Sequence, residues 1–283
     1  FGPDVCTARN PRLIYGRMTG WGQSGPLAHR PGHDINYIAL TGALDSIGNA
    51  GERPVPPLNL VGDFGGGALY LAVGVLAALH ERTRSGLGQV IDAAMVDGTA
   101  SLMSMMYELH DSGLWEGERG TNLLDGGCPF YDTYQTADGR YMAVGALEPQ
   151  FFEILMEHLG IDRSGKPAQY DPTGWTDMRR EVAEAFRKRT RAEWTELFAA
   201  TDACVTPVLS MAEARSNASN VARDVFIDVA GSIQPGPAPR FSRTAPELPG
   251  PSPDSGEHTD EILAEIGLDS ARVADLRARG VVH

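Results

Sequence analysis

The sequence predicts an α/β protein followed by a small α+β unit, and two observations carry this prediction. In the first 110 residues, short apolar runs typical of strands, at 12–17 and 89–92, alternate with longer helical patterns at 64–84 and 93–109. Farther along, two strand-like runs flank an Asp-Gly turn at 138–139, which is typical of a hairpin. Alternating helices and strands indicate a parallel sheet, whereas a local hairpin indicates antiparallel pairing.

The elements of the first block can be assigned in order. Residues 20–32 and 45–57 are rich in glycine, proline and polar residues, so we expect loops there. Apolar residues within 33–44 recur at helical spacing, which predicts a short helix. We expect 64–84 to be a buried helix, and the methionine-rich helix at 93–109 to belong to the core.

The second block begins after a polar, glycine-rich stretch at 115–127, which we expect to be a linker. The hairpin strands are predicted at 131–135 and 141–145. Amphipathic patterns and a β-branched run predict the remaining elements: helices at 150–159 and 177–200, a strand at 204–208, a proline-rich return at 233–253, and helices at 259–267 and 270–279.

Composition excludes several classes of protein. The 283 residues include 24 Lys and Arg against 37 Asp and Glu, a net charge of −13, which argues against nucleic-acid partners. The longest apolar run, 68–79, is too short to span a bilayer, so we expect no membrane partner. Three widely spaced cysteines without metal-ligand spacing fit a reduced cytoplasm and predict no metal site.

Three titratable residues lie among small and apolar neighbours. His33 follows Pro-Gly, Asp63 lies between Val-Gly and Phe-Gly-Gly-Gly, and Glu148 lies between Ala-Leu and Pro. Ionisable side chains partly removed from water in this way are typical of proton-transfer sites. Taken alone, each also has a structural interpretation: a polar His33, a helix-capping Asp63, a Glu148 that starts a helix, and glycines at 65–67 that allow close packing.

Several long motifs in order resemble the family III CoA-transferases, and within them the branch of α-methylacyl-CoA racemases. The motifs are Arg-Met-Thr-Gly-Trp-Gly-Gln at 17–23, Gly-His-Asp-Ile-Asn-Tyr at 32–37, Pro-Pro-Leu-Asn-Leu-Val-Gly-Asp-Phe-Gly-Gly-Gly at 56–67, and Gly-Gln-Val-Ile-Asp-Ala-Ala-Met-Val-Asp-Gly at 88–98. The resemblance extends from about residue 10 to about residue 243.

The resemblance implies a Rossmann-like CoA-binding large domain, a small α+β domain, and two subunits that interlock. The large domain would be discontinuous, and we expect its N-terminal part, with most of the CoA phosphate contacts, to be missing from this chain. The implied boundaries are 1–92 with 239–283 for the large domain, 93–128 and 218–238 for linkers, and 129–217 for the small domain.

The resemblance also implies roles for individual residues in the interconversion of (2R)- and (2S)-2-methylacyl-CoA esters. His33 would exchange the proton on the 2S face and Asp63 that on the 2R face, with an enolate between the two steps. Glu148 of the other subunit would orient His33, and Asn59 would hydrogen-bond Asp63. The helix expected to begin at 64–67 would hold the enolate oxygen, and no metal, nicotinamide or flavin is implied. The segment lining the thioester would comprise Gly32, His33, Asp34, Ile35, Asn36 and Tyr37.

Two other functions use the same residues. In the CoA-transferases of this family, the aspartate equivalent to Asp63 is a nucleophile that forms a mixed anhydride. A second base such as His33 is required for racemisation and not for transfer, which favours the racemase. The third hypothesis is a dimerising chain without catalytic activity.

Overall fold

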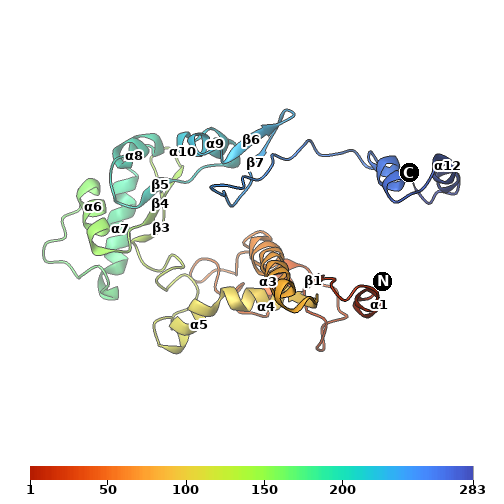
Figure 1. The fold of residues 1–283 in the computed structure, drawn as a ribbon. Helices are drawn as coiled ribbons and strands as arrows, with labels where there is room; N and C mark the ends of the chain where they lie inside the picture. The colour runs from red at the N-terminus through yellow and green to blue at the C-terminus, as the bar shows by residue number, and fades with distance from the viewer. Residues whose placement is uncertain (283) are drawn as a thin grey trace. The chain divides into compact units, whose positions relative to one another are not determined.

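A computed structural model describes residues 1–282, which form two compact units (Figure 1). The first unit is Phe1–Val208, and the second begins at Leu209. The predicted discontinuous large domain, 1–92 with 239–283, stays a prediction.

The first unit opens with a two-stranded parallel sheet. Strand β1 pairs with β2 in a register that runs from Tyr15↔Val90 to Thr19↔Ala94. Parallel strands need a long crossover, and helices supply it here. The elements of this block are α1 (Pro3–Arg9), β1 (Tyr15–Thr19), α2 (Asp34–Ala39), the π-helix η1 (Leu60–Leu69), α3 (Tyr70–Ser85) and β2 (Val90–Ala94).

The helix that contains Asp63 begins earlier than the sequence suggested. It starts as a π-helix at Leu60 and continues directly into α3, so Asp63 lies inside its first turn. The expected start at 64–67 is therefore wrong. Glycine at 66 allows this helix to pack closely against the segment of Thr99, because a Cβ at Gly66 would lie 2.7 Å from the backbone nitrogen of Thr99.

The methionine-rich segment forms two helices, α4 (Met95–Leu102) and α5 (Ser104–Asp111), rather than one. Helix α4 packs against η1 so closely that a Cβ at Gly98 would lie 1.9 Å from the carbonyl oxygen of Gly66. The expectation that this whole segment is core is wrong for α5, which has no buried residue.

The sequence predicted a buried helix at 64–84, but the helix over 60–85 is largely exposed in this chain. Large apolar side chains on it are 53–66% exposed, namely Leu60, Phe64, Leu69, Val73 and Leu76. Because η1 and α3 run on as one helix, Leu60–Ser85 is long and apolar enough to cross a membrane by length and composition. A single helix of this kind is weak evidence for a membrane span, because core helices of soluble proteins pass the same test.

The small block of the first unit is a three-stranded antiparallel sheet with helices packed on it (Figure 1). The hairpin predicted around Asp138-Gly139 is confirmed, with Gln135 opposite Tyr141. The helix predicted at 177–200 is two helices, because the side chain of Thr190 caps a new one. The elements are β3 (Tyr131–Gln135), β4 (Tyr141–Gly145), α6 (Pro149–Leu159), the 3₁₀ turn η2 (Pro172–Gly174), α7 (Trp175–Phe186), α8 (Arg191–Phe198) and β5 (Val205–Pro207).

The stretch at 115–127, expected to be a linker, is an ordered loop. The carboxyl group of Asp125 accepts hydrogen bonds from the backbone nitrogens of Gly120, Asn122 and Gly127 at 2.8–3.1 Å. The guanidinium of Arg119 donates to the carbonyl oxygen of Asp45 at 2.6 Å. The Asp125 bonds hold the loop together, and the Arg119 bond ties it to the segment that follows α2.

The second unit contains a hairpin that the sequence did not reveal. Strand β6 pairs with β7 across Ala230 and Gly231, both of which have positive φ. The helices predicted near the C-terminus are confirmed. The elements are α9 (Met211–Ser216), α10 (Ala218–Ala222), β6 (Phe226–Val229), β7 (Ser232–Pro235), α11 (Thr259–Glu265) and α12 (Ser270–Ala278).

Candidate functional site

His33 occupies the N-cap position of α2, and its side chain is exposed. Its backbone nitrogen donates to Oδ1 of Asn36 at 3.0 Å, and the hydroxyl of Tyr37 donates to the carbonyl oxygen of Gly32. Tyr37 also packs edge-on against Trp21, with ring centroids 4.8 Å apart. The backbone on both sides of His33 is therefore fixed, while its imidazole remains accessible.

Asp63 is half-buried in the first turn of η1. The side-chain amide of Asn59 donates to its Oδ2 at 3.0 Å, which confirms the predicted contact. Asp63 is not a helix cap, because Asn59 holds that position. Its carboxyl group is thus oriented by a neighbour one turn earlier.

Asp34 joins the His33 segment to the Asp63 segment. Its Oδ2 accepts hydrogen bonds from the backbone nitrogens of Gly62 at 2.7 Å and Asp63 at 2.8 Å. The residue after His33 is thereby bonded directly to Asp63, so the two predicted bases come from adjoining segments. The same bonds remove the amides at 62 and 63 as donors to an enolate oxygen.

The proximity of Asp63 to Tyr37 is also visible in electrostatics. Burial raises the pKa of the Tyr37 hydroxyl, and the charge of Asp63 raises it further. Of the predicted substrate segment 32–37, Asp34 and Tyr37 are buried and bonded to protein, whereas Ile35 is 42% exposed. His33, Ile35 and Asn36 are therefore the exposed side chains of this segment, and the side chain of Asn36 already accepts a hydrogen bond from the backbone of His33.

Glu148 lies at the N-cap position of α6, is exposed, and makes no capping hydrogen bond with its side chain. The loop before it is held by Gln169, whose Nε2 donates to the carbonyl oxygens of Ala146 at 3.0 Å and Leu147 at 2.8 Å. Burial and then the charge of Glu148 raise the pKa of the Cys204 thiol. Within residues 1–282, no hydrogen bond or ion pair joins Glu148 to His33.

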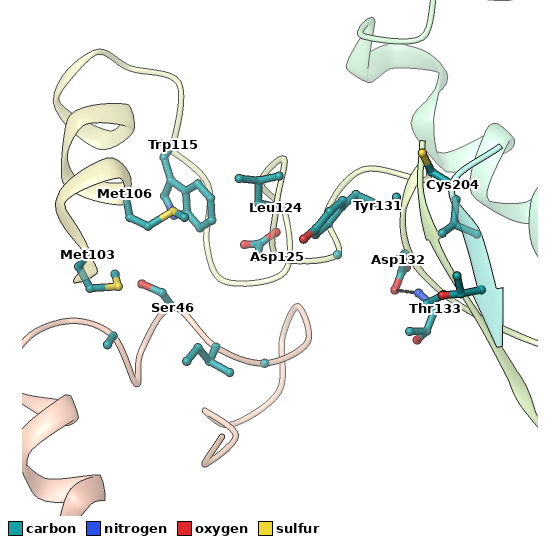
Figure 2. A pocket seen from close by; sticks show the side chains of 18 residues that line it. Ser46, Met103, Met106, Trp115, Leu124, Asp125, Tyr131, Asp132, Thr133 and Cys204 are labelled. Carbon is teal, nitrogen blue, oxygen red and sulfur yellow. Dashed lines mark hydrogen bonds between the residues drawn. The ribbon is translucent and has the colours of Figure 1, made fainter. Parts of the chain in front are cut away.

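The first unit contains a cavity of about 690 Å³ between helix α5 with the loop after it and the small antiparallel sheet (Figure 2). Met103, Met106 and Trp115 line one side, and Tyr131 and Cys204 line the side formed by the small sheet. Neither predicted base lines it, nor do Asn59 and Glu148. Sequence reasoning missed this cavity, and the only signal for it was the pair Met103 and Met106, which were expected to belong to the core.

In the described part of the chain, no group of three or more His, Cys, Asp or Glu side chains lies close enough together to hold a metal ion.

Comparison with curated proteins gives long matches. The chain is 49% identical over 285 residues to an alpha-methylacyl-CoA racemase of Mus musculus and 47% identical to that of Homo sapiens, covering 100% of this chain and 74% of each relative. It is 30% identical over 295 residues to the beta subunit of a succinyl-CoA–L-malate CoA-transferase of Chloroflexus aurantiacus, covering 99% of this chain and 72% of the relative.

A solved structure and a family match agree with these relatives. The structure of a CAIB/BAIF family protein from Brucella suis superimposes with a TM-score of 0.79 at 25% identity, covering 94% of this chain and 71% of that one. Residues 1–259 match CoA-transferase family III. The chain belongs to CoA-transferase family III.

Proposed function

We propose that this protein is a racemase that interconverts (2R)- and (2S)-2-methylacyl-CoA esters by proton transfer between two bases. The observation that carries the proposal is the hydrogen bond between Asp34 and the backbone nitrogen of Asp63, because it brings the segment of His33 beside that of Asp63. The similarity along the whole chain to two alpha-methylacyl-CoA racemases supports the same activity.

The reaction follows from two groups on opposite faces of the α-carbon. From the 2S epimer, His33 takes the α-proton, and the electron pair of the C–H bond moves into an enolate. Asp63 then delivers a proton to the other face, which gives the 2R epimer; the reverse reaction exchanges the roles. The exposed His33 and half-buried Asp63 both remain accessible to solvent, so protons removed from substrate can exchange with water.

Solvent exchange tests this reaction directly. Incubated in D₂O with a 2-methylacyl-CoA ester, the protein should incorporate deuterium at the α-carbon while interconverting the epimers, measured by mass spectrometry and chiral chromatography. His33→Ala and Asp63→Ala should each lower epimerisation by roughly 10²–10⁴-fold. An Asp63→Ala variant within about threefold of the parent would contradict the two-base assignment.

CoA transfer is the second candidate, because relatives in the same family include several CoA-transferases. Asp63 would then attack the thioester carbonyl, expelling CoA thiolate and forming a mixed anhydride. Transfer of CoA to a free carboxylic acid without α-deuteration would favour this activity. Hydroxylamine should attack the aspartyl carbonyl of the anhydride, release the free acyl carboxylate and leave a hydroxamate on Asp63, which peptide mass spectrometry detects.

The proposed assembly is a homodimer in which Glu148 of one subunit orients His33 of the other. Two features of the single chain support it: His33 and Glu148 have no bond to each other, and the apolar face of η1 and α3 is exposed. Obligate dimers bury large apolar interfaces of this kind. Leu76→Glu, on that face, should shift the sedimentation of the protein from dimer to monomer. An unchanged dimer would exclude this face from the interface.

A further inference from the structure

Asp34 is buried, with 6% of its surface exposed. Its side chain contacts the backbone nitrogen of Asp63. One carboxyl oxygen accepts both amide hydrogens of Gly62 and Asp63, at 2.7 and 2.8 Å. The other oxygen, Oδ1, is buried and has no hydrogen-bond partner. A buried carboxyl group with one of its two oxygens unsatisfied is costly, so its presence here calls for an explanation.

The surroundings show that this contact is built into the chain. A Cβ at Gly62 would lie 2.6 Å from Oδ2 of Asp34, so any side chain at 62 would displace the carboxyl group. The side-chain amide of Asn59 donates a hydrogen bond to Oδ2 of Asp63, at the end of the Asp63 side chain. Asp63 is therefore fixed twice, at its backbone nitrogen by Asp34 and at its carboxyl group by Asn59.

We propose that Asp34 is a positioning residue that sets where the carboxyl group of Asp63 meets the α-carbon of the substrate. The inference rests on the proposed racemase activity and adds to it. The side chain of Asp34 bonds to the backbone nitrogens of Gly62 and Asp63, so it acts through the backbone of Asp63. It should therefore govern proton transfer on the Asp63 face and leave the His33 face largely unaffected. A displacement of about 1 Å at a reacting group can lower a rate by about 100-fold.

The two faces can be measured separately in D₂O. The parent should exchange the α-proton of both epimers and invert both. In Asp34→Ala, exchange and inversion starting from the 2R epimer should fall by about 100-fold, because Asp63 must remove that proton. Starting from the 2S epimer, His33 still removes the proton and returns deuterium to the same face. Deuteration with retained configuration should therefore exceed inversion by at least about tenfold.

Two further variants make the result specific. Asp34→Asn keeps an oxygen that can accept both amides, so it should recover most of the 2R-face rate. Asp97→Asn changes an exposed carboxyl on the neighbouring helix α4 and should match the parent. Circular dichroism melts establish that each variant is folded. If Asp34→Ala does not fold, the ratio of retention to inversion is read on Asp34→Ser, whose shorter side chain cannot accept both amides.

The outcomes separate the two proposals. Equal losses on both faces, with an unchanged ratio of retention to inversion, would overturn the positioning role of Asp34. A parent protein that never deuterates the α-carbon would instead overturn the racemase activity.

Discussion

The side-chain amide of Asn59 donates a hydrogen bond of 3.0 Å to Oδ2 of Asp63, one turn along the π-helix. Both residues belong to η1 or its cap, so the contact depends on where that helix begins. A standard α-helix starting at 64 would place Asn59 outside the helix. The early π-helical start therefore supplies the partner of the proposed base.

Replacing Asn59 should lower the rate of epimerisation. Asn59→Ala removes one hydrogen bond to a carboxyl group that is partly exposed, and we expect kcat to fall about tenfold with little change in KM. Asn59→Asp places a second carboxyl group against the first and should lower kcat further. Steady-state kinetics on both epimers measure these effects, and a change confined to KM would assign Asn59 to substrate binding instead.

The close contact between η1 and α4 predicts a strong effect of a single methyl group. In Gly98→Ala, the new Cβ would lie 1.9 Å from the carbonyl oxygen of Gly66, and backbone must move to relieve this clash. We expect a loss of about 3 kcal/mol in the free energy of unfolding, with loss of activity, measured by denaturant melts. The control is Gly2→Ala, whose Cβ meets nothing within 4 Å. Equal stability of the two variants would contradict the close contact between Gly98 of α4 and Gly66 of η1.

Local signals in the sequence predicted some elements and missed others for identifiable reasons. The β3–β4 hairpin was predictable because Asp138-Gly139 is a strong turn signal. The β6–β7 hairpin was missed because its turn is Ala230-Gly231, and alanine rarely adopts the positive φ of 53° found there. Oδ1 of Asp228 stabilises that turn by accepting from the backbone nitrogen of Gly231 at 2.7 Å, a contact no turn motif indicates.

The site was predictable in its residues and less so in its geometry. The contact of Asn59 with Asp63 is local and was expected. Asp34 accepts hydrogen bonds from the first turn of η1 and lies 28 positions before Gly62, so no window of sequence around Asp63 contains this contact. Helical periodicity likewise identifies the apolar face of α3. It does not indicate whether that face is buried by the same chain or by another one.

Arg179 should be important for the stability of the first unit. Its guanidinium donates to the carbonyl oxygens of Gly126 at 2.7 Å and Gly127 at 2.8 Å, and also to Asp132. Arg179→Ala leaves three half-buried acceptors without this partner and should cost about 2 kcal/mol. Arg179→Lys should recover less than half of that, because an ammonium group cannot reach all three.

The neighbouring arginine provides the control for this prediction. Arg180 lies on the same helix and pairs with Asp177, and both side chains are more than 60% exposed. Arg180→Ala should change the free energy of unfolding by less than about 0.5 kcal/mol. Similar losses in thermal and urea melts for the two variants would mean that the contacts of Arg179 contribute no more than a surface pair.

Cys128 should resist alkylation while the protein is folded. Its side chain is fully buried, and this burial raises the pKa of the thiol to about 11. At pH 8 the reactive thiolate is then roughly a thousandth of the total, against about a quarter for a free cysteine. Iodoacetamide labelling followed by peptide mass spectrometry should modify the exposed Cys204 and leave Cys128 intact until urea unfolds the chain. Rapid native labelling of Cys128 would show that the core around it opens.

Sharing of the site between subunits can be tested by mixing two impaired chains. His33→Ala and Glu148→Ala chains, unfolded together and refolded, should form heterodimers in which one site carries both lesions and the other carries none. With random pairing, activity should rise to about a quarter of the parent, above the mean of the two variants. The matched control mixes His33→Ala with Asp63→Ala. Both of these residues lie in the segments joined by Asp34, so each heterodimer site keeps one lesion and no activity should return. If neither mixture recovers, Glu148 serves the His33 of its own chain.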